Sequence, residues 1–371
     1  MKIIHISDTH LGFSEYFKID PVSGINQREQ DFYNAWNYVV DEIIRQRPDF
    51  VVHAGDLFHT SRPVNRAIAV ALEGIQKISD AGIPFVAISG NHSTPKIRAT
   101  GSIFESISLL PNVFASFRSQ YEKFLVNGCA IHCVPHCSLT EELERAFQSI
   151  QVDSDNLFNI LITHGAWAGN RQFSMGEFNE QHIQDPEINQ KLKFDYIALG
   201  HYHKHLKIKP HAVYSGATER TSFNEAGNST GFVMVDLETS TIEYHETPSR
   251  PMIRLAAVDC SDLNSQDIYA QLEKLSTPQL TDALVTLHLN NVQHDTLIQL
   301  ENREIDAIFQ HVFYLNKTLS QTLSGSSQTN DSLNLVSLPM EFERYLANVE
   351  LGELDKERLK LLGLEYLSRE L

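Results

Sequence analysis

Five short apolar runs constrain the fold most, because each is rich in Ile, Val or Leu and each ends in a polar residue. They read KIIHISD, FVVHAGD, PFVAISGNH, NILITH and YIALGH. Runs of this length and composition are typical of strands that are buried on both faces of a sheet. The sequence therefore predicts a sheet covered on both sides, with Asp, Asn and His at one end of its strands.

Two amphipathic segments separate the first three runs. In residues 28–47 one helical face carries an apolar stripe made of Phe32, Trp36, Val39, Val40, Ile43 and Ile44. Residues 65–82 show a similar pattern and stop at Gly82, a residue type that commonly follows the last turn of a helix. Strands that alternate with helices predict an α/β layered domain, which we place at residues 1–245.

The character of the chain changes after this domain. Residues 250–320 contain three strand-like and two helix-like stretches, which predict a small α+β domain. The polar, Ser-rich residues 321–338 have the composition of a linker. Residues 339–371 give two short amphipathic helices that are too small to hold a core, so their apolar face is expected to need a partner.

Composition excludes several classes of protein. No segment of the 371 residues is apolar enough to span a bilayer, and the N-terminus lacks the features of a signal peptide, so we expect a cytoplasmic protein. The net charge of −17 argues against nucleic-acid binding over the whole surface. It leaves room for a local basic groove, and Lys204, Lys207 and Lys209 form either such a cluster or an ordinary solvated face.

The stretch CAIHCVPHC holds three of the four cysteines and suggests zinc at first sight. However, zinc motifs pair close ligands with a second pair farther along the chain, and Pro135 prevents a helix from aligning the thiols. We favour instead a half-buried strand in which Cys129, Ile131 and Cys133 share one face.

The polar residues that end the five runs are expected to converge, because ligand crevices form at the carboxyl ends of strands in α/β sheets. They are Asp8, His10, Asp56, Asn91, His92, His164, His201 and His203. Seven of these side chains, without thiolate, suit Mn²⁺, Fe²⁺ or Zn²⁺ and are too many for one tetrahedral ion. We therefore predict two ions, roughly 3.5–4 Å apart, of the kind that catalyse phosphoryl displacement.

The pattern Asp-x-His, Gly-Asp, Gly-Asn-His, His, Gly-His-x-His resembles that of the calcineurin-like metallophosphoesterases. HISDTHLG, HAGDLFH, THGAW, GHYHK and YSGATERTSFNE narrow the resemblance to the SbcD-type DNA repair nucleases, bacterial relatives of the meiotic-recombination nuclease. The resemblance implies a layered sheet sandwich flanked by helices, a small α+β capping domain and a C-terminal helix-loop-helix. It covers the first domain well and the second more weakly.

The resemblance also implies roles for the polar residues. Two sets of metal ligands would share Asp56: Asp8, His10, Asp56 and His203 for one ion, and Asp56, Asn91, His164 and His201 for the other. Manganese is the metal we expect. His92 would stabilise the developing charge and protonate the leaving oxygen.

Several neighbours carry less definite expectations. His59 and Arg62 lie in the loop along which the family runs its DNA, so both are candidate phosphate contacts. Arg220 is a third candidate, although it is equally suited to ordering its own loop. His53 is expected beneath the site as a supporting or packing residue, and His205 is expected to be solvated.

Residue 93 departs from the family pattern, which usually has Asp directly after the Gly-Asn-His motif. Here Ser93 stands in that position. A hydroxyl can still accept the imidazole N–H of His92, but it stabilises an imidazolium less than a carboxylate does. Metal binding is expected to survive this change, whereas efficient acid catalysis is in doubt.

The resemblance predicts a two-metal DNA nuclease, an exonuclease and possibly an endonuclease, that acts in double-strand break repair. It further implies a homodimer and an SbcC-type coiled-coil ATPase bound through the C-terminal helices. Two alternatives stay open at the level of sequence. One is a phosphoesterase acting on nucleotides or small phosphodiesters, and the other is a weakly active scaffold subunit, for which Ser93 is the motive.

Overall fold

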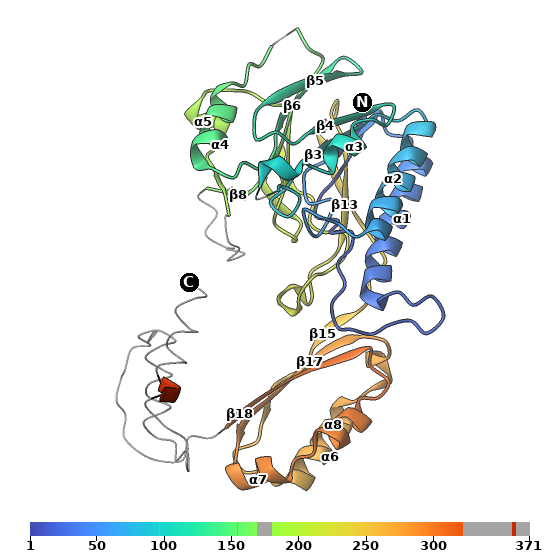
Figure 1. The fold of residues 1–371 in the computed structure, drawn as a ribbon, viewed down its shortest axis with the longest axis vertical. Helices are drawn as coiled ribbons and strands as arrows, with labels where there is room; N and C mark the ends of the chain where they lie inside the picture. The colour runs from blue at the N-terminus through green and yellow to red at the C-terminus, as the bar shows by residue number, and fades with distance from the viewer. Residues whose placement is uncertain (96, 154, 169–179, 322–357, 361–371) are drawn as a thin grey trace. The chain divides into compact units, whose positions relative to one another are not determined.

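The computed structural model describes residues 1–321, except 96, 154 and 169–179, together with 358–360 (Figure 1). Residues 1–322 form one compact unit and 323–371 another. The predicted linker and helix pair therefore lie almost wholly outside the described residues. None of the described helices combines the length and the apolar character needed to cross a membrane.

The first layer is a six-stranded mixed sheet in the order β14-β13-β1-β2-β3-β4. Its central strands run parallel, whereas β13 is antiparallel to both β1 and β14. The strands are β1 (Lys2–Ile6), β2 (Phe50–His53), β3 (Phe85–Ile88), β4 (Val113–Ser116), β13 (Gly231–Asp236) and β14 (Thr241–Glu246).

The second layer is another six-stranded mixed sheet, in the order β11-β12-β10-β7-β6-β5. Its four inner strands are parallel and its two edge strands are antiparallel to their neighbours. The strands are β5 (Glu122–Val126), β6 (Cys129–Val134), β7 (Asn159–His164), β10 (Tyr196–Gly200), β11 (Leu206–Lys209) and β12 (Ala212–Tyr214).

Alternation of side chains along the strands explains why both sheets are buried on both faces. In β2, Phe50 and Val52 join the core between the two sheets, while Val51 joins the core beneath the helices. The helices α1 (Gln27–Gln46) and α2 (Asn65–Asp80) cover the outer face of the first sheet (Figure 1). The predicted stripe of α1 is buried there except for the partly buried Ile44, and Gly82 adopts a positive φ of 77° just after α2 ends.

The outer face of the second sheet packs against α4 (Thr140–Gln148) and the short strand pair β8 (Ala166–Trp167) and β9 (His182–Ile183). Smaller elements complete this region: η1 (Arg98–Thr100), α3 (Phe104–Ile107), α5 (Pro186–Asn189) and η2 (Phe223–Glu225). The sheets, their helices and the core between them form the predicted sandwich.

The cysteine-containing strand β6 corrects one prediction. Cys129, Ile131 and Cys133 do share the face toward the inter-sheet core, but every residue of β6 is buried, so the strand is not half-buried. All four cysteines are free, and none belongs to a metal-like cluster of described residues.

Residues 252–321 form a parallel sheet around the long strand β17. The predicted strand MIRLAAVDC divides into β15 and β16, which both pair with β17, and the second predicted helix divides at residues 300–301. The elements are β15 (Met252–Arg254), β16 (Val258–Asp259), α6 (Ser265–Leu275), η3 (Pro278–Leu280), β17 (Leu284–Val292), α7 (His294–Gln299), α8 (Asn302–Ile308) and β18 (Tyr314–Gln321). Helices and sheet share a separate apolar core.

Candidate metal centre

The predicted ligands gather where strands of both sheets end. The first sheet contributes Asp8 and His10 after β1, Asp56 after β2 and Asn91 after β3, while the second contributes His164 at the end of β7 and His201 and His203 after β10. All except the half-buried Asn91 are buried. Because parallel strands of both layers end at the same edge, residues nearly 200 positions apart meet there.

Asp8, His10 and His203 form one compact group, in which one potential ligand atom of each lies within 4.8 Å of the others. The Nε2 atoms of His10 and His203 are only 2.9 Å apart. Two ring nitrogens at this distance can share a proton or face one cation, so the donor set fits a divalent ion.

Asp8, Asp56 and His164 form a second group that meets the same distance limit. The Nε2 atom of His164 lies 3.1 Å from Oδ2 of Asp56 and 2.8 Å from Oδ1 of Asn91. Asp8 is therefore the carboxylate common to both groups in the structure, whereas the resemblance implies Asp56 as the shared ligand.

His201 lies beside these groups and belongs to neither of them. Its ring centroid is 5.4 Å from that of His164, and its backbone N–H donates to both carboxylate oxygens of Asp8 at 3.1 Å. The structure thus brings His201 next to the second group and gives it a contact with the shared carboxylate.

Hydrogen bonds on the far side of three rings set their orientation. His203 Nδ1 donates to Glu225 over 2.8 Å, His164 Nδ1 donates to the carbonyl oxygen of Ala54 over 2.8 Å, and His201 Nε2 donates to Glu180 over 3.0 Å. Carbonyl and carboxylate oxygens accept only, so in the neutral form of each ring the opposite nitrogen carries the lone pair and is the one available to a cation.

Glu225 and Glu180 are site residues that the strand-end pattern did not single out. Glu225 ends the quoted stretch YSGATERTSFNE and also accepts hydrogen bonds from Thr221. Burial acts to raise the pKa of Glu225, but the charge and the hydrogen bond of His203 together hold it below its ordinary value. No spacing rule connects either glutamate to its histidine, so only the fold shows the pairing.

The pKa values of the two buried aspartates are shifted in opposite directions. Burial raises the pKa of Asp8 above its ordinary value. Burial acts in the same direction on Asp56, but the charge of His164 beside it outweighs this and lowers the pKa of Asp56 well below the usual range. Two carboxylates held together away from water require positive charge nearby, and a divalent cation supplies it.

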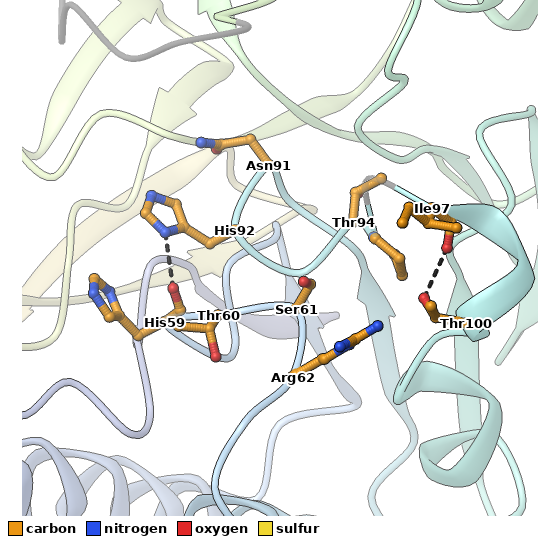
Figure 2. Close-up of a pocket in the computed structure, with 10 residues that line it drawn as sticks. His59, Thr60, Ser61, Arg62, Asn91, His92, Thr94, Ile97 and Thr100 are labelled. Carbon is orange, nitrogen blue, oxygen red and sulfur yellow. Dashed lines mark hydrogen bonds between the residues drawn. The ribbon is translucent and has the colours of Figure 1, made fainter. Parts of the chain in front are cut away.

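His92 is held by the backbone of the neighbouring loop and not by residue 93. Its Nδ1 atom donates to the carbonyl oxygen of His59 over 2.9 Å (Figure 2), and its backbone N–H donates to Asp56 over 2.9 Å. The Ser93 hydroxyl is buried and lies 3.5 Å from the carbonyl oxygen of Phe58. The expected hydroxyl acceptor is therefore replaced by a backbone carbonyl.

A cavity of about 610 Å³ opens beside Asn91 and His92 (Figure 2). The rings of His59 and His92 stack at its inner end, with centroids 5.2 Å apart, and exposed Arg62 lies farther along the wall. His59 and Arg62, two of the three candidate phosphate contacts, thus line a hollow that begins at the candidate metal centre.

The other predicted neighbours have structural partners. His53 is buried, contacts the Thr9 hydroxyl at 3.1 Å, and has its pKa lowered to about 3 by burial, so it stays neutral beneath the site. Arg220 donates to the carbonyl oxygens of Asn228 and Arg250, contacts that suit the expected alternative of ordering its own loop.

His205 is not solvated as expected. It is half-buried, its Nδ1 lies 3.0 Å from the carbonyl oxygen of Tyr214, and its ring stacks on Tyr244. In the predicted lysine cluster, Lys209 is paired with Asp185 and Glu187, so it contributes little free charge.

Comparisons with known proteins identify a family and several relatives of this chain. Residues 1–205 match the family described as calcineurin-like phosphoesterase. The DNA double-strand break repair protein Mre11 of Methanococcus maripaludis is 27% identical over 375 residues, which cover 95% of this chain and 92% of that protein. Mre11 of Thermoplasma acidophilum is 28% identical over 82% of this chain and 81% of its own length.

Mre11 of Haloferax volcanii is 27% identical over 78% of this chain, a match that spans 61% of that longer protein. These proteins are relatives of the chain across most of its length. The family match covers more than half of the chain, including every predicted metal ligand, and this chain belongs to the calcineurin-like phosphoesterase family.

Proposed function

We propose that this protein is a DNA nuclease that hydrolyses phosphodiester bonds with the help of two divalent metal ions, most suitably Mn²⁺. The observation that carries the proposal is the pair of buried ligand groups that share Asp8. Adjacent groups of nitrogen and oxygen donors without thiolate are suited to two hard or borderline cations.

The proposed ligands are the seven strand-end residues together: Asp8, His10, Asp56, Asn91, His164, His201 and His203. When bound, the two ions would neutralise phosphate charge and lower the pKa of water so that it can attack phosphorus. Glu225, Glu180 and the Ala54 carbonyl keep the histidine rings turned toward the site.

His92 is proposed as the proton donor for the leaving oxygen. Its Nδ1 atom donates to the His59 carbonyl, so Nε2 is the ring nitrogen that we propose exchanges a proton with substrate. His59 and Arg62 line the adjoining cavity and are proposed as contacts for the phosphates on either side of the scissile bond.

Several relatives are named as DNA double-strand break repair proteins, which favours DNA as substrate and end processing as the role. We propose in addition that residues 339–371 bind an SbcC-type ATPase and that the protein acts as a homodimer. The sequence supports the ATPase site through the apolar residues Phe342, Tyr345 and Leu346. A chain ending at residue 335 should lose the ATPase in a pull-down while it keeps its nuclease activity.

The main test measures degradation of linear single- and double-stranded DNA, and of a small phosphodiester reporter, with Mn²⁺, Mg²⁺ or a chelator. We expect DNA hydrolysis with Mn²⁺, its loss with chelator, and its loss in Asp8→Asn. Asp80→Asn, at an exposed aspartate that ends α2, is the matched control and should keep full activity. Hydrolysis of the reporter without any cleavage of DNA would identify a small-molecule phosphoesterase instead.

A further inference from the structure

Three hollows follow one another along the surface that starts at His92. The first is the cavity in Figure 2, of about 610 Å³, and it shares Thr94 and Pro95 with a second hollow of about 270 Å³. The second shares Arg118 and Ser119 with a third hollow of about 380 Å³. The shared walls make the three hollows one series that leads from the candidate metal centre toward α4.

Each hollow in this series has an exposed arginine in its wall: Arg62, Arg118 and Arg145. Arg118 lies over the ring of Phe117 at 4.6 Å and has a loose ion pair with Glu122 at 3.7 Å. The side chain of Arg145 donates to a carbonyl of its own helix, and Arg62 has no ion pair with any described residue. The guanidinium groups thus stay open to an anionic ligand.

The rest of the lining supplies hydroxyls and flat or apolar surfaces. Pro95 and Ile97 lie in the first hollow and Tyr121 in the third, whereas the Phe117 ring in the second is buried under the Arg118 guanidinium. The hydroxyl groups come from Thr60, Ser61, Thr94, Thr100, Ser102, Ser119, Ser138 and Ser149. Cationic groups interspersed with hydroxyls and stacking surfaces are the chemistry that holds a single nucleic-acid strand.

Two carboxylates complete the lining and limit the charge. Glu105 lines the second hollow and Glu142 the third, so neither hollow is strongly positive. A strand would be held by stacking and hydrogen bonding as much as by charge. A lining with both positive and negative side chains suits a product strand that must move along the hollows. Such a lining is also compatible with the protein's net charge of −17.

We propose that the three hollows form a track for single-stranded DNA, with the strand continuing from the scissile phosphate past Arg62 and Pro95 to Arg118 and Arg145. This inference rests on the proposed nuclease function, because it assigns the nucleotides next to the cleaved bond to the first hollow. The track has no role in the chemical step, and it sets the length of strand that the protein binds.

The test measures binding of fluorescein-labelled oligothymidylates of 2 to 12 nucleotides to the full-length protein by anisotropy, with chelator present to prevent cleavage. Wild-type affinity should rise with length. Arg118→Ala and Arg145→Ala should each weaken binding of the 12-mer by roughly fivefold and lower its salt dependence, while binding of the dinucleotide stays unchanged. Arg45→Ala, at an exposed arginine of α1 outside the series, is the matched control.

Several results would overturn the track. They are equal losses for the dinucleotide and the 12-mer, no loss for either, losses confined to a hairpin duplex, or tighter binding of oligouridylate than of oligothymidylate. The nuclease assay separates the two proposals. If DNA is cleaved but the arginine variants bind normally, only the track fails. If the variants lose length-dependent binding but no DNA is cleaved, only the nuclease proposal fails.

Discussion

At the scale of single residues, the candidate centre is built from strained backbone. Asp8, His10, Asp56 and His201 all have positive φ angles, of 52°, 43°, 53° and 109°. Residues other than glycine rarely adopt this conformation, and where they do the strain commonly marks a functional site. The sequence pattern indicated these residues because they end buried strands. It could not indicate their partners, since the Ala54 and His59 carbonyls carry no side-chain signal and Glu225 is 22 positions from His203.

Glu225→Ala tests whether a supporting carboxylate tunes metal binding. Loss of the hydrogen bond to Nδ1 frees the His203 ring, and such changes typically weaken metal affinity by about 10–100-fold. We expect a loss in this range for Mn²⁺ measured by calorimetry, and a smaller one for Glu225→Gln, whose amide oxygen still accepts. Glu243→Ala, at an exposed glutamate, should bind Mn²⁺ normally. Unchanged affinity in Glu225→Ala would show that His203 needs no such support.

At the scale of elements, the five predicted strands all form, because short apolar runs rich in Ile and Val suit strands that are buried on both faces of a sheet. The edge strands and the breaks within elements are harder to predict from the sequence. The split between β15 and β16, and that between α7 and α8, depend on the register with β17 and on packing, which local pattern does not encode.

The turns that follow β2 and β3 contain glycines because their backbone passes very close to neighbouring side chains. A Cβ atom at Gly55 would lie 2.3 Å from Nδ1 of His164, and one at Gly90 would lie 2.3 Å from Oδ1 of Asp56.

Gly55→Ala and Gly82→Ala separate backbone strain from crowding. Both glycines have positive φ, of 98° and 77°, but a Cβ atom at Gly82 meets nothing within 4 Å. Gly82→Ala should cost about 1 kcal/mol of stability and leave metal binding intact. Gly55→Ala should in addition displace His164 and weaken Mn²⁺ binding at least about tenfold. Calorimetric titration and thermal unfolding distinguish them, and equal metal affinity in the two variants would contradict the crowding explanation.

At the scale of the whole molecule, a buried ionic network joins distant parts of residues 1–322. Fully buried Arg28 on α1 contacts Asp31 at 2.7 Å, Glu219 at 3.4 Å and the Arg220 carbonyl at 2.6 Å. Asp31 is in turn paired with Arg250, which donates to the carbonyl oxygen of Asp282. The network fixes the loop that carries Glu225. The sequence pattern does not reveal this network, because its members are spread over about 250 positions with no periodic spacing.

Removal of the central charge should destabilise the fold. Burial raises the pKa of Glu219, and Arg28 opposes this shift. In Arg28→Met the carboxylate loses its buried partner, a change that typically costs about 3–5 kcal/mol. We expect a loss of this size in urea unfolding of the metal-free protein. Arg28→Met with Glu219→Gln should recover part of it, because the second change removes the uncompensated charge. A double variant no more stable than the single one would argue against the pairing.

The position of β1 between β2 and β13 has a consequence for synthesis of the chain. Lys2–Ile6 takes one neighbour from residues 50–53 and the other from residues 231–236. A nascent chain emerging from the ribosome therefore keeps one edge of its first strand unpaired until almost two thirds of the protein has been made. His201 and His203 are also synthesised late, so Asp8 and His10 lack these neighbours for most of that time. We therefore expect the proposed metal centre to be completed late in synthesis, because a translation product that stops before residue 200 lacks two of the seven proposed ligands, His201 and His203.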